Sequence, residues 1–305
     1  MFPAEMPRTR FIEIDVQSAL TRMGGMRVPG GHWSLNPYRG CQHDCVYCYA
    51  RYTHTYLELN PTTDFARTLF VKRNLAAALA ADLRRPGWRR QRVHIGTATD
   101  PYQPAEGHYR LTQAALRLLR QQITPATLVT KNTLALRDAD LMAELAEAAG
   151  FRLIMSITTL DETLAGQLEP DAPSPQQRLR AVQALAAGGV PVSVAAAPIL
   201  PGLTDSVEAL TALFTAAYDH GAEIAFHQTL RLYGPTRGAL FGFLQQHHPE
   251  LIRPYRAAFG ASQDAPMAYR QQMQARIEEI RSRLAPRSPG QARPPRRSGQ
   301  LALEL

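Results

Sequence analysis

Short apolar runs alternate with longer amphipathic segments through most of this 305-residue chain. Such alternation is typical of β-α units, in which each strand of a parallel sheet is followed by a helix that covers it. Several runs are apolar throughout, as expected of strands with both faces covered. Six strands are predicted, over residues 32–36, 92–97, 126–130, 151–157, 190–197 and 223–228. The predicted fold class is therefore α/β, with a parallel sheet that is open or curled into part of a barrel.

Helix signals lie between these runs. Ser174 and Gln177 have the spacing of a capping box, and the helix that they begin should end at Gly188. After residue 232 the pattern changes to helices alone, predicted over residues 237–246, 249–259 and 266–284. We expect these helices to pack against the open edge of the sheet.

These changes of pattern divide the chain into four parts. Residues 1–29 form an N-terminal extension, residues 30–235 the α/β core domain, and residues 236–285 a helical region packed on that core. Residues 286–305 are rich in proline, arginine, serine and glycine, so we expect a disordered basic tail there.

The chain has no run of about 18 apolar residues, so no transmembrane helix is expected. Proline and arginine interrupt the first ten residues, which lack the apolar stretch of a signal peptide. We therefore expect a cytoplasmic protein with no membrane partner.

The formal net charge is +8, and part of it is concentrated in five arginines among residues 84–92. Basic segments bind nucleic-acid phosphates in some proteins and are solvated surface loops in others, so both interpretations stay open. This segment precedes the second predicted strand. It should therefore lie at the edge of the sheet where strands begin, opposite the loops that follow them.

All three cysteines, Cys41, Cys45 and Cys48, lie within eight residues. An odd, clustered set does not make a disulfide framework, and in a reducing compartment such clusters bind metal or take part in redox chemistry. One loop with this spacing can fold its thiolates around a single cluster. A closed 4Fe–4S site takes four cysteines, so three leave one iron open to a cofactor. The alternatives are a zinc site, with His43 or His54 as fourth ligand, and three buried thiols.

The Cys-x3-Cys-x2-Cys spacing, with Tyr47 before the last cysteine, resembles the radical S-adenosylmethionine (SAM) superfamily. The resemblance implies a partial (β/α)6 barrel of TIM type for the core domain. It also implies a 4Fe–4S cluster on the three cysteines, whose open iron is chelated by SAM. In that superfamily, reduction of the cluster cleaves SAM to methionine and a 5′-deoxyadenosyl radical, which abstracts hydrogen from a substrate. An external donor of flavodoxin or ferredoxin type would supply the electrons, since no cysteine is left for a second cluster.

A narrower resemblance, to the spore photoproduct lyase-like branch, covers roughly residues 30–235. It rests on residues 96–106, 129–131, 156–161, 168–170 with Arg178, and 197–205, in the same order and at strand ends. It implies that the residues near SAM are Thr97, Thr99, Asp100, Lys131, Ser156 and Arg178. Lys131 would pair with the SAM carboxylate, and Ser156 would bond the carboxylate or the ribose. The alternatives are a turn-capping role for Asp100 and surface or packing roles for the others.

Tyr47 and Tyr49 flank Cys48. In spore photoproduct lyases, tyrosines at matching positions are implicated in returning a hydrogen atom after repair. Aromatic packing over the cluster is the alternative role. His227 and Arg231 follow the sixth predicted strand and are expected to contact the substrate at the same mouth of the barrel.

One departure concerns the hydrogen donor. Spore photoproduct lyase uses a further cysteine outside the cluster motif, and this chain has none. We therefore expect a radical SAM enzyme, lyase-like, with an unidentified substrate. Two alternatives stay open: a lyase that repairs DNA lesions, with nucleic acid as its partner, and a non-catalytic protein that binds zinc or an iron–sulfur cluster. Product formation from damaged DNA tests the first, and metal analysis tests the second.

Overall fold

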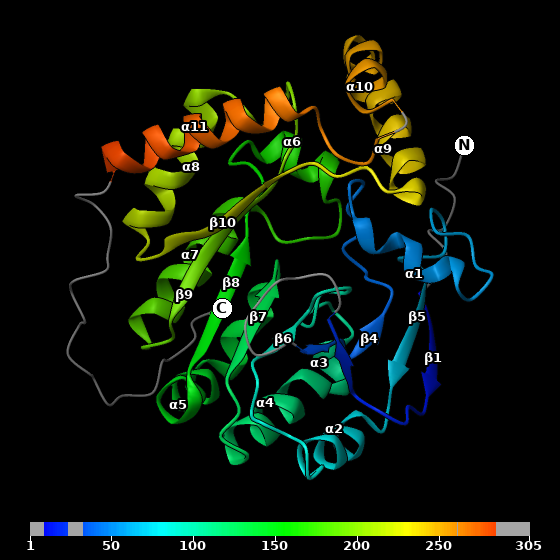
Figure 1. The fold of residues 1–305 in the computed structure, drawn as a ribbon, viewed down its shortest axis with the longest axis vertical. Helices are drawn as coiled ribbons and strands as arrows, with labels where there is room; N and C mark the ends of the chain where they lie inside the picture. Colours follow the sequence, from blue (N-terminus) through cyan, green and yellow to red (C-terminus); the bar gives the residue numbers. More distant parts are fainter. Residues whose placement is uncertain (1–8, 24–32, 261, 285–305) are drawn as a thin grey trace, which may run out of the picture.

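The computed structural model describes residues 9–23, 33–260 and 262–284. The start of the first predicted strand, at residue 32, and the predicted tail over residues 286–305 lie outside this part of the chain. Most of the described chain forms a mixed α/β structure around one large sheet (Figure 1).

The large sheet has seven strands in the order β10-β9-β8-β7-β6-β3-β2. Its parallel members are β3 (Trp33–Leu35), β6 (Val93–Ile95), β7 (Ala126–Thr130), β8 (Phe151–Ser156), β9 (Val192–Ile199) and β10 (Glu223–Thr229). β2 (Leu20–Arg22) pairs antiparallel with β3 at one edge. The α/β class and the six parallel strands predicted from the apolar runs are confirmed, with neighbouring strands following in chain order.

The second predicted strand is shorter than its apolar run because Gly96 ends it. Gly96 has φ +86°, and a Cβ atom there would lie 2.6 Å from the carbonyl oxygen of Val129. Only glycine allows the chain to turn this close to β7. The turn directs residues 97–100 across the carboxyl edge of the sheet.

A second sheet, which the sequence pattern did not predict, contains β1 (Arg10–Ile14), β5 (Thr68–Lys72) and β4 (Tyr38–Arg39). β1 runs parallel to β5, and β4 pairs antiparallel with it. This small sheet lies on the β6 side of the large sheet (Figure 1). The cysteine segment follows its strand β4 and leads to η1 and α1.

Helices connect and cover the strands. They are η1 (Tyr49–Arg51), α1 (Tyr52–Thr55), α2 (Leu75–Leu83), α3 (Glu106–Tyr109), α4 (Leu111–Gln121), η2 (Thr133–Asp138), α5 (Ala139–Ala149), α6 (Glu162–Leu168), α7 (Pro175–Ala187), α8 (Val207–Asp219), α9 (Gly234–His247), η3 (Pro249–Leu251), α10 (Ile252–Phe259) and α11 (Met267–Leu284). The predicted capping box of α7 is present, because Ser174 Oγ accepts from the Gln177 amide at 3.3 Å and Gln177 Oε1 accepts from the Ser174 amide at 2.8 Å.

The three C-terminal helices divide between two places. α11 packs on α8 beside the edge strand β10, where Met273, Ile277 and Ile280 join the main core. α9 and α10 instead form a second apolar cluster with the cysteine segment, through Leu240 and Phe259 among others. Of the three helices, α11 packs at the sheet edge, whereas the contacts of α9 and α10 lie elsewhere. Their buried apolar residues cover the cysteine segment instead. None of the helices described here is long and apolar enough to cross a membrane.

Candidate functional site

The cysteine loop, residues 40–48, begins after β4 at Gly40, where a residue with a side chain would not fit. Gly40 has φ +87°, and a Cβ atom there would lie 2.8 Å from the carbonyl oxygen of Phe65. The next residue, Cys41, donates its amide to that same carbonyl at 3.1 Å. The loop therefore starts from a fixed point against the segment that precedes β5.

Arg51 is buried against the cysteine loop and donates hydrogen bonds to it. Its side chain is 2% exposed, and its Nη2 donates to the Cys45 carbonyl at 3.0 Å and to Asp44 Oδ1 at 2.7 Å. Its Nη1 also donates to the carbonyl of Thr62 at 3.1 Å, on the segment before β5. A planar group with five donors can bridge these acceptors together, which an ammonium group could not.

The three cysteines are free thiols; Cys41 and Cys45 are buried and Cys48 is half-buried. Burial raises the pKa of all three, that of Cys45 to about 12. Nearby Lys131 lowers the pKa of Cys45 but does not offset the burial. A metal centre would supply the positive charge that holds these sulfurs as thiolates.

A buried carboxylate, Glu169, lies next to the loop. It pairs with Arg178, lies 3.7 Å from Lys131 Nζ, and accepts hydrogen bonds from Tyr47 and from Thr158. Burial opposes its ionisation, but Arg178 and Lys131 outweigh that effect and hold its pKa at about 2. The carboxylate is therefore ionised at neutral pH and links the loop to the ends of β7 and β8.

Lys131 follows β7 and is 14% exposed. Its Nζ donates to Ser156 Oγ at 2.8 Å and lies 5.6 Å from the centre of the Tyr47 ring. Burial opposes its charge, but Glu169 and Cys45 raise its pKa above the usual value. The structure thus brings together four of the residues predicted to form the site: Tyr47, Lys131, Ser156 and Arg178.

Asp100 forms a second polar group at the same edge. It accepts from the Lys131 amide at 2.7 Å and from Thr130 Oγ1 at 2.6 Å, and Oδ2 lies 3.3 Å from His43 Nδ1. It also accepts from the Tyr102 amide, so the capping role that the sequence suggested is present as well. Burial raises the pKa of Asp100, but His43 and these hydrogen bonds lower it by more. The net pKa is therefore below the usual value.

The other predicted residues have different partners. Thr99 Oγ1 donates to the Gly40 carbonyl at 2.6 Å, so its hydroxyl supports the start of the loop. Thr97 Oγ1 accepts from Asn36 Nδ2 at 3.0 Å, and its carbonyl accepts from the Tyr49 hydroxyl. The ring of Tyr49 is 45% exposed and lies 6.1 Å from that of Tyr233.

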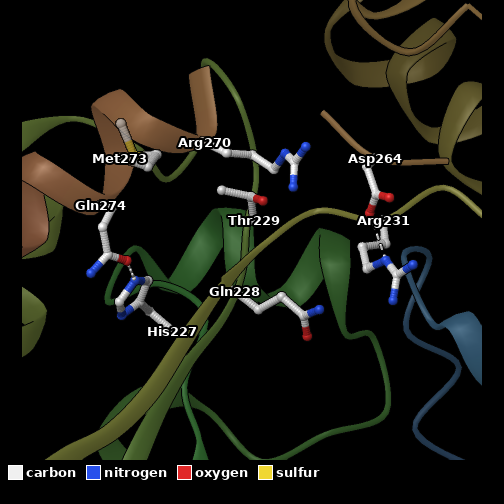
Figure 2. A pocket seen from close by; sticks show the side chains of 8 residues that line it. All are labelled: His227, Gln228, Thr229, Arg231, Asp264, Arg270, Met273 and Gln274. Carbon is white, nitrogen blue, oxygen red and sulfur yellow. Dashed lines mark hydrogen bonds and ion pairs between the residues drawn. The ribbon is translucent and has the colours of Figure 1, made fainter. Parts of the chain in front are cut away.

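His227 and Arg231 lie in a separate cleft between β10 and α11 (Figure 2). His227 Nε2 is 2.9 Å from Gln274 Oε1, and Arg231 pairs with Asp264 at 2.7 Å. Neither contacts the residues around Glu169 directly.

Glu169 belongs to the motif at residues 168–170, but it was not among the predicted site residues. A signal was available, because Glu169 stands at the C-terminal end of α6. A negative charge there opposes the helix dipole, so its position calls for a tertiary partner.

The profile of the Radical SAM superfamily matches residues 35–214, more than half of the chain. The chain is a member of the radical SAM superfamily. This radical SAM protein is 40% identical over 270 residues to an uncharacterized protein of Mycobacterium tuberculosis (strain ATCC 25618 / H37Rv), over 88% of this chain and 79% of the relative. An uncharacterized protein of Methanocaldococcus jannaschii is 27% identical over 194 residues, or 64% of this chain and 70% of the relative.

Solved structures of spore photoproduct lyase share the fold of this radical SAM protein. A mutant of that enzyme matches with a TM-score of 0.63 at 15% identity, over 91% of this chain and 80% of the other. Its complex with dinucleoside spore photoproduct matches with a TM-score of 0.63 at 14% identity, over the same shares. The family match confirms the predicted resemblance to the radical SAM superfamily, and these structures show that the fold of spore photoproduct lyase is shared.

Proposed function

We propose that this chain is a radical SAM enzyme that holds a 4Fe–4S cluster on Cys41, Cys45 and Cys48 and acts on an unidentified substrate by hydrogen abstraction. The observation that carries the proposal is the juxtaposition of three free thiols in one loop with the polar residues at the carboxyl ends of β7 and β8. Ligands of α/β sheets bind at this edge. When bound, the cluster supplies the electron that cleaves SAM.

The donor set consists of thiols, which are the usual ligands of iron–sulfur clusters. In the described part of the chain, no three His, Cys, Asp or Glu side chains are close enough together to hold one ion. A zinc ion needs its ligands to converge on one point. A cluster takes each thiolate on a different iron, so its ligands stand apart. Three free thiols in one loop match the ligand set of a cluster that keeps one iron open.

We propose that Lys131 and Ser156 bind the SAM carboxylate. Lys131 is charged, shielded from water and already oriented by Ser156 Oγ. Asp100, an ionised carboxylate at the same edge, suits the amino group of SAM. Thr99 and Arg178 support the residues around SAM. Thr99 donates to the Gly40 carbonyl, and Arg178 donates to the Ser156 carbonyl at 3.0 Å. Tyr49, which is 45% exposed and donates its hydroxyl to the Thr97 carbonyl, would contact an approaching substrate.

The test is anaerobic reconstitution of the full chain with iron and sulfide, followed by reduction with SAM and an assay for 5′-deoxyadenosine. A flavodoxin or ferredoxin serves as the external electron donor, in keeping with a cytoplasmic enzyme. We expect a cluster absorption band and 5′-deoxyadenosine in the native chain, and neither in Cys45→Ala. Zinc at one per chain, with no iron uptake, would overturn the proposal.

A further inference from the structure

The cleft between β10 and α11 has a volume of about 420 Å³, within the range of small-molecule sites (Figure 2). Its walls are the end of β10, the segment before α11, and the first turns of α11. The cleft lies at the edge of the large sheet where the strands end. On its wall, Arg231 lies 5.0 Å from the centre of the Tyr233 ring, and the Tyr233 ring centre is 6.1 Å from that of Tyr49, the residue after Cys48.

The walls of this cleft are tied together. Arg231 and Asp264 form an isolated β-bridge as well as an ion pair, and the Leu232 amide donates to the Gln263 carbonyl at 2.7 Å. On the other side, Gln274 of α11 contacts His227 of β10 at 2.9 Å. The cleft is therefore formed by linked elements before a ligand arrives.

The lining of the cleft carries an excess of positive charge. It contains two guanidinium groups and one carboxylate, and Asp264 uses that carboxylate on Nε of Arg231. Arg270 donates its Nε to the Ala265 carbonyl at 3.0 Å, and no carboxylate of the described chain lies within 4.0 Å of it. Figure 2 shows its side chain extending from α11, and Thr229 lines the same cleft from β10. Among the described residues, the terminal nitrogens of Arg270 contact only the sulfur of Met267, at 3.8 Å.

The remaining polar side chains of the cleft are neutral. Gln228 offers an amide and Thr229 a hydroxyl. Burial lowers the pKa of His227, so that ring stays uncharged at neutral pH. A guanidinium held by one nitrogen, with the amide of Gln228 and the hydroxyl of Thr229 in the same cleft, has the chemistry of an oxyanion site.

We propose that this cleft binds a compact oxyanion group, a carboxylate or a phosphate, carried by the substrate. The proposal rests on the proposed function, because it treats the cleft as a subsite of the same reaction. Arg270 is its principal ligand, and Arg231 contributes the terminal nitrogens that Asp264 does not use. The anion anchors the substrate at one end while the other end reaches past Tyr233 toward the cysteine loop.

The probes are inorganic phosphate and acetate, titrated into the full chain at low ionic strength without iron or SAM. Binding is followed by ³¹P line broadening for phosphate and by ¹H saturation transfer for acetate. We expect Arg270→Gln to weaken binding about tenfold, as the loss of a charge-assisted hydrogen bond predicts. Arg270 is exposed, so this variant should fold normally. Arg89→Gln, at an exposed arginine of the 84–92 segment, removes the same charge elsewhere and should leave binding unchanged.

If Arg270→Gln loses phosphate binding alone, the cleft is assigned to a phosphate group of the substrate. If it loses acetate binding alone, the cleft is assigned to a carboxylate. Binding of neither anion, or equal weakening by Arg270→Gln and Arg89→Gln, would overturn the proposal. Because iron and SAM are absent from this titration, its outcome is independent of whether 5′-deoxyadenosine forms.

Discussion

At the scale of single residues, the polar network of the site depends on the charge of Glu169. This buried carboxylate is the shared partner of Arg178, Lys131 and Tyr47. Glu169→Gln keeps the shape of the side chain but leaves two buried cations without their counter-ion. We expect the free energy of unfolding to fall by about 3–5 kcal/mol, the usual result of removing one partner of a buried ion pair. Urea denaturation of the chain without iron measures it.

Glu162→Gln is the matched control. Glu162 is exposed in the first turn of α6, the helix that ends at Glu169. Its loss should change the free energy of unfolding by less than about 1 kcal/mol. If the two variants lose the same stability, the network around Glu169 contributes little.

The pKa of Glu169 also predicts a pH dependence. Although burial opposes ionisation, Arg178 and Lys131 lower this pKa from 4.5 to about 2 in the folded chain. A lowered folded-state pKa stabilises the fold above the unfolded value, and that stability is lost as the pH falls toward the folded value. We expect the difference in unfolding free energy between the native chain and Glu169→Gln to be constant above pH 5. It should shrink by about 3 kcal/mol in total below that. A difference that persists unchanged to pH 3 would contradict this assignment.

At the scale of elements, α9 forms a clamp on the cysteine loop. Thr236, fully buried in the first turn of α9, donates its hydroxyl to the Cys48 carbonyl at 2.9 Å. Thr236→Val keeps the volume of the side chain but removes this donor. The buried Cys48 carbonyl then loses that hydrogen bond, which should lower the free energy of unfolding by about 1–3 kcal/mol. We expect the amides of residues 41–51 to exchange with deuterium about tenfold faster, because the loop opens more easily.

Thr236→Ser is the control for this clamp, since it keeps the hydroxyl and removes only a methyl group. Exchange in the loop should stay close to that of the native chain. Amides of β8, far from α9 in the chain and in the main sheet, report on global unfolding in both variants. Faster exchange in β8 to the same degree as in the loop would show a general loss of stability instead of a clamp.

At the scale of the whole molecule, the large sheet could be predicted and the small one could not. β8, for example, carries Phe151, Leu153, Ile154 and Met155 within six residues, an apolar pattern that the local sequence shows directly. β4 is only Tyr38–Arg39, too short to show a period, and β1 finds its partner β5 58 residues away along the chain. Long-range pairing of this kind leaves no local signal.

The candidate site divides in the same way. Lys131 and Ser156 could be predicted because the ends of neighbouring parallel strands must meet at one edge. The place of Arg231 could not be predicted, since it depends on Asp264, which α9, η3 and α10 bring back to the segment after β10. Side chains whose partners come from irregular segments are fixed by tertiary packing, which the strand pattern does not contain.

The sheet also separates two charged regions. Residues 84–92 join α2 to the start of β6, so Arg89 and Arg90 lie at the opposite edge from Lys131, which follows the end of β7. Parallel strands place every strand end on one edge, and a charge exposed at the other edge is largely screened at physiological salt. We therefore expect Arg89→Ala with Arg90→Ala to leave the rate of 5′-deoxyadenosine formation within about twofold of the native rate. Lys131→Ala should lower it more than about tenfold, through loss of a charge-assisted contact with SAM. Reconstituted proteins matched for iron content make the comparison. A large loss in the double arginine variant would mean that the two edges are coupled, and that the basic segment belongs to the site after all.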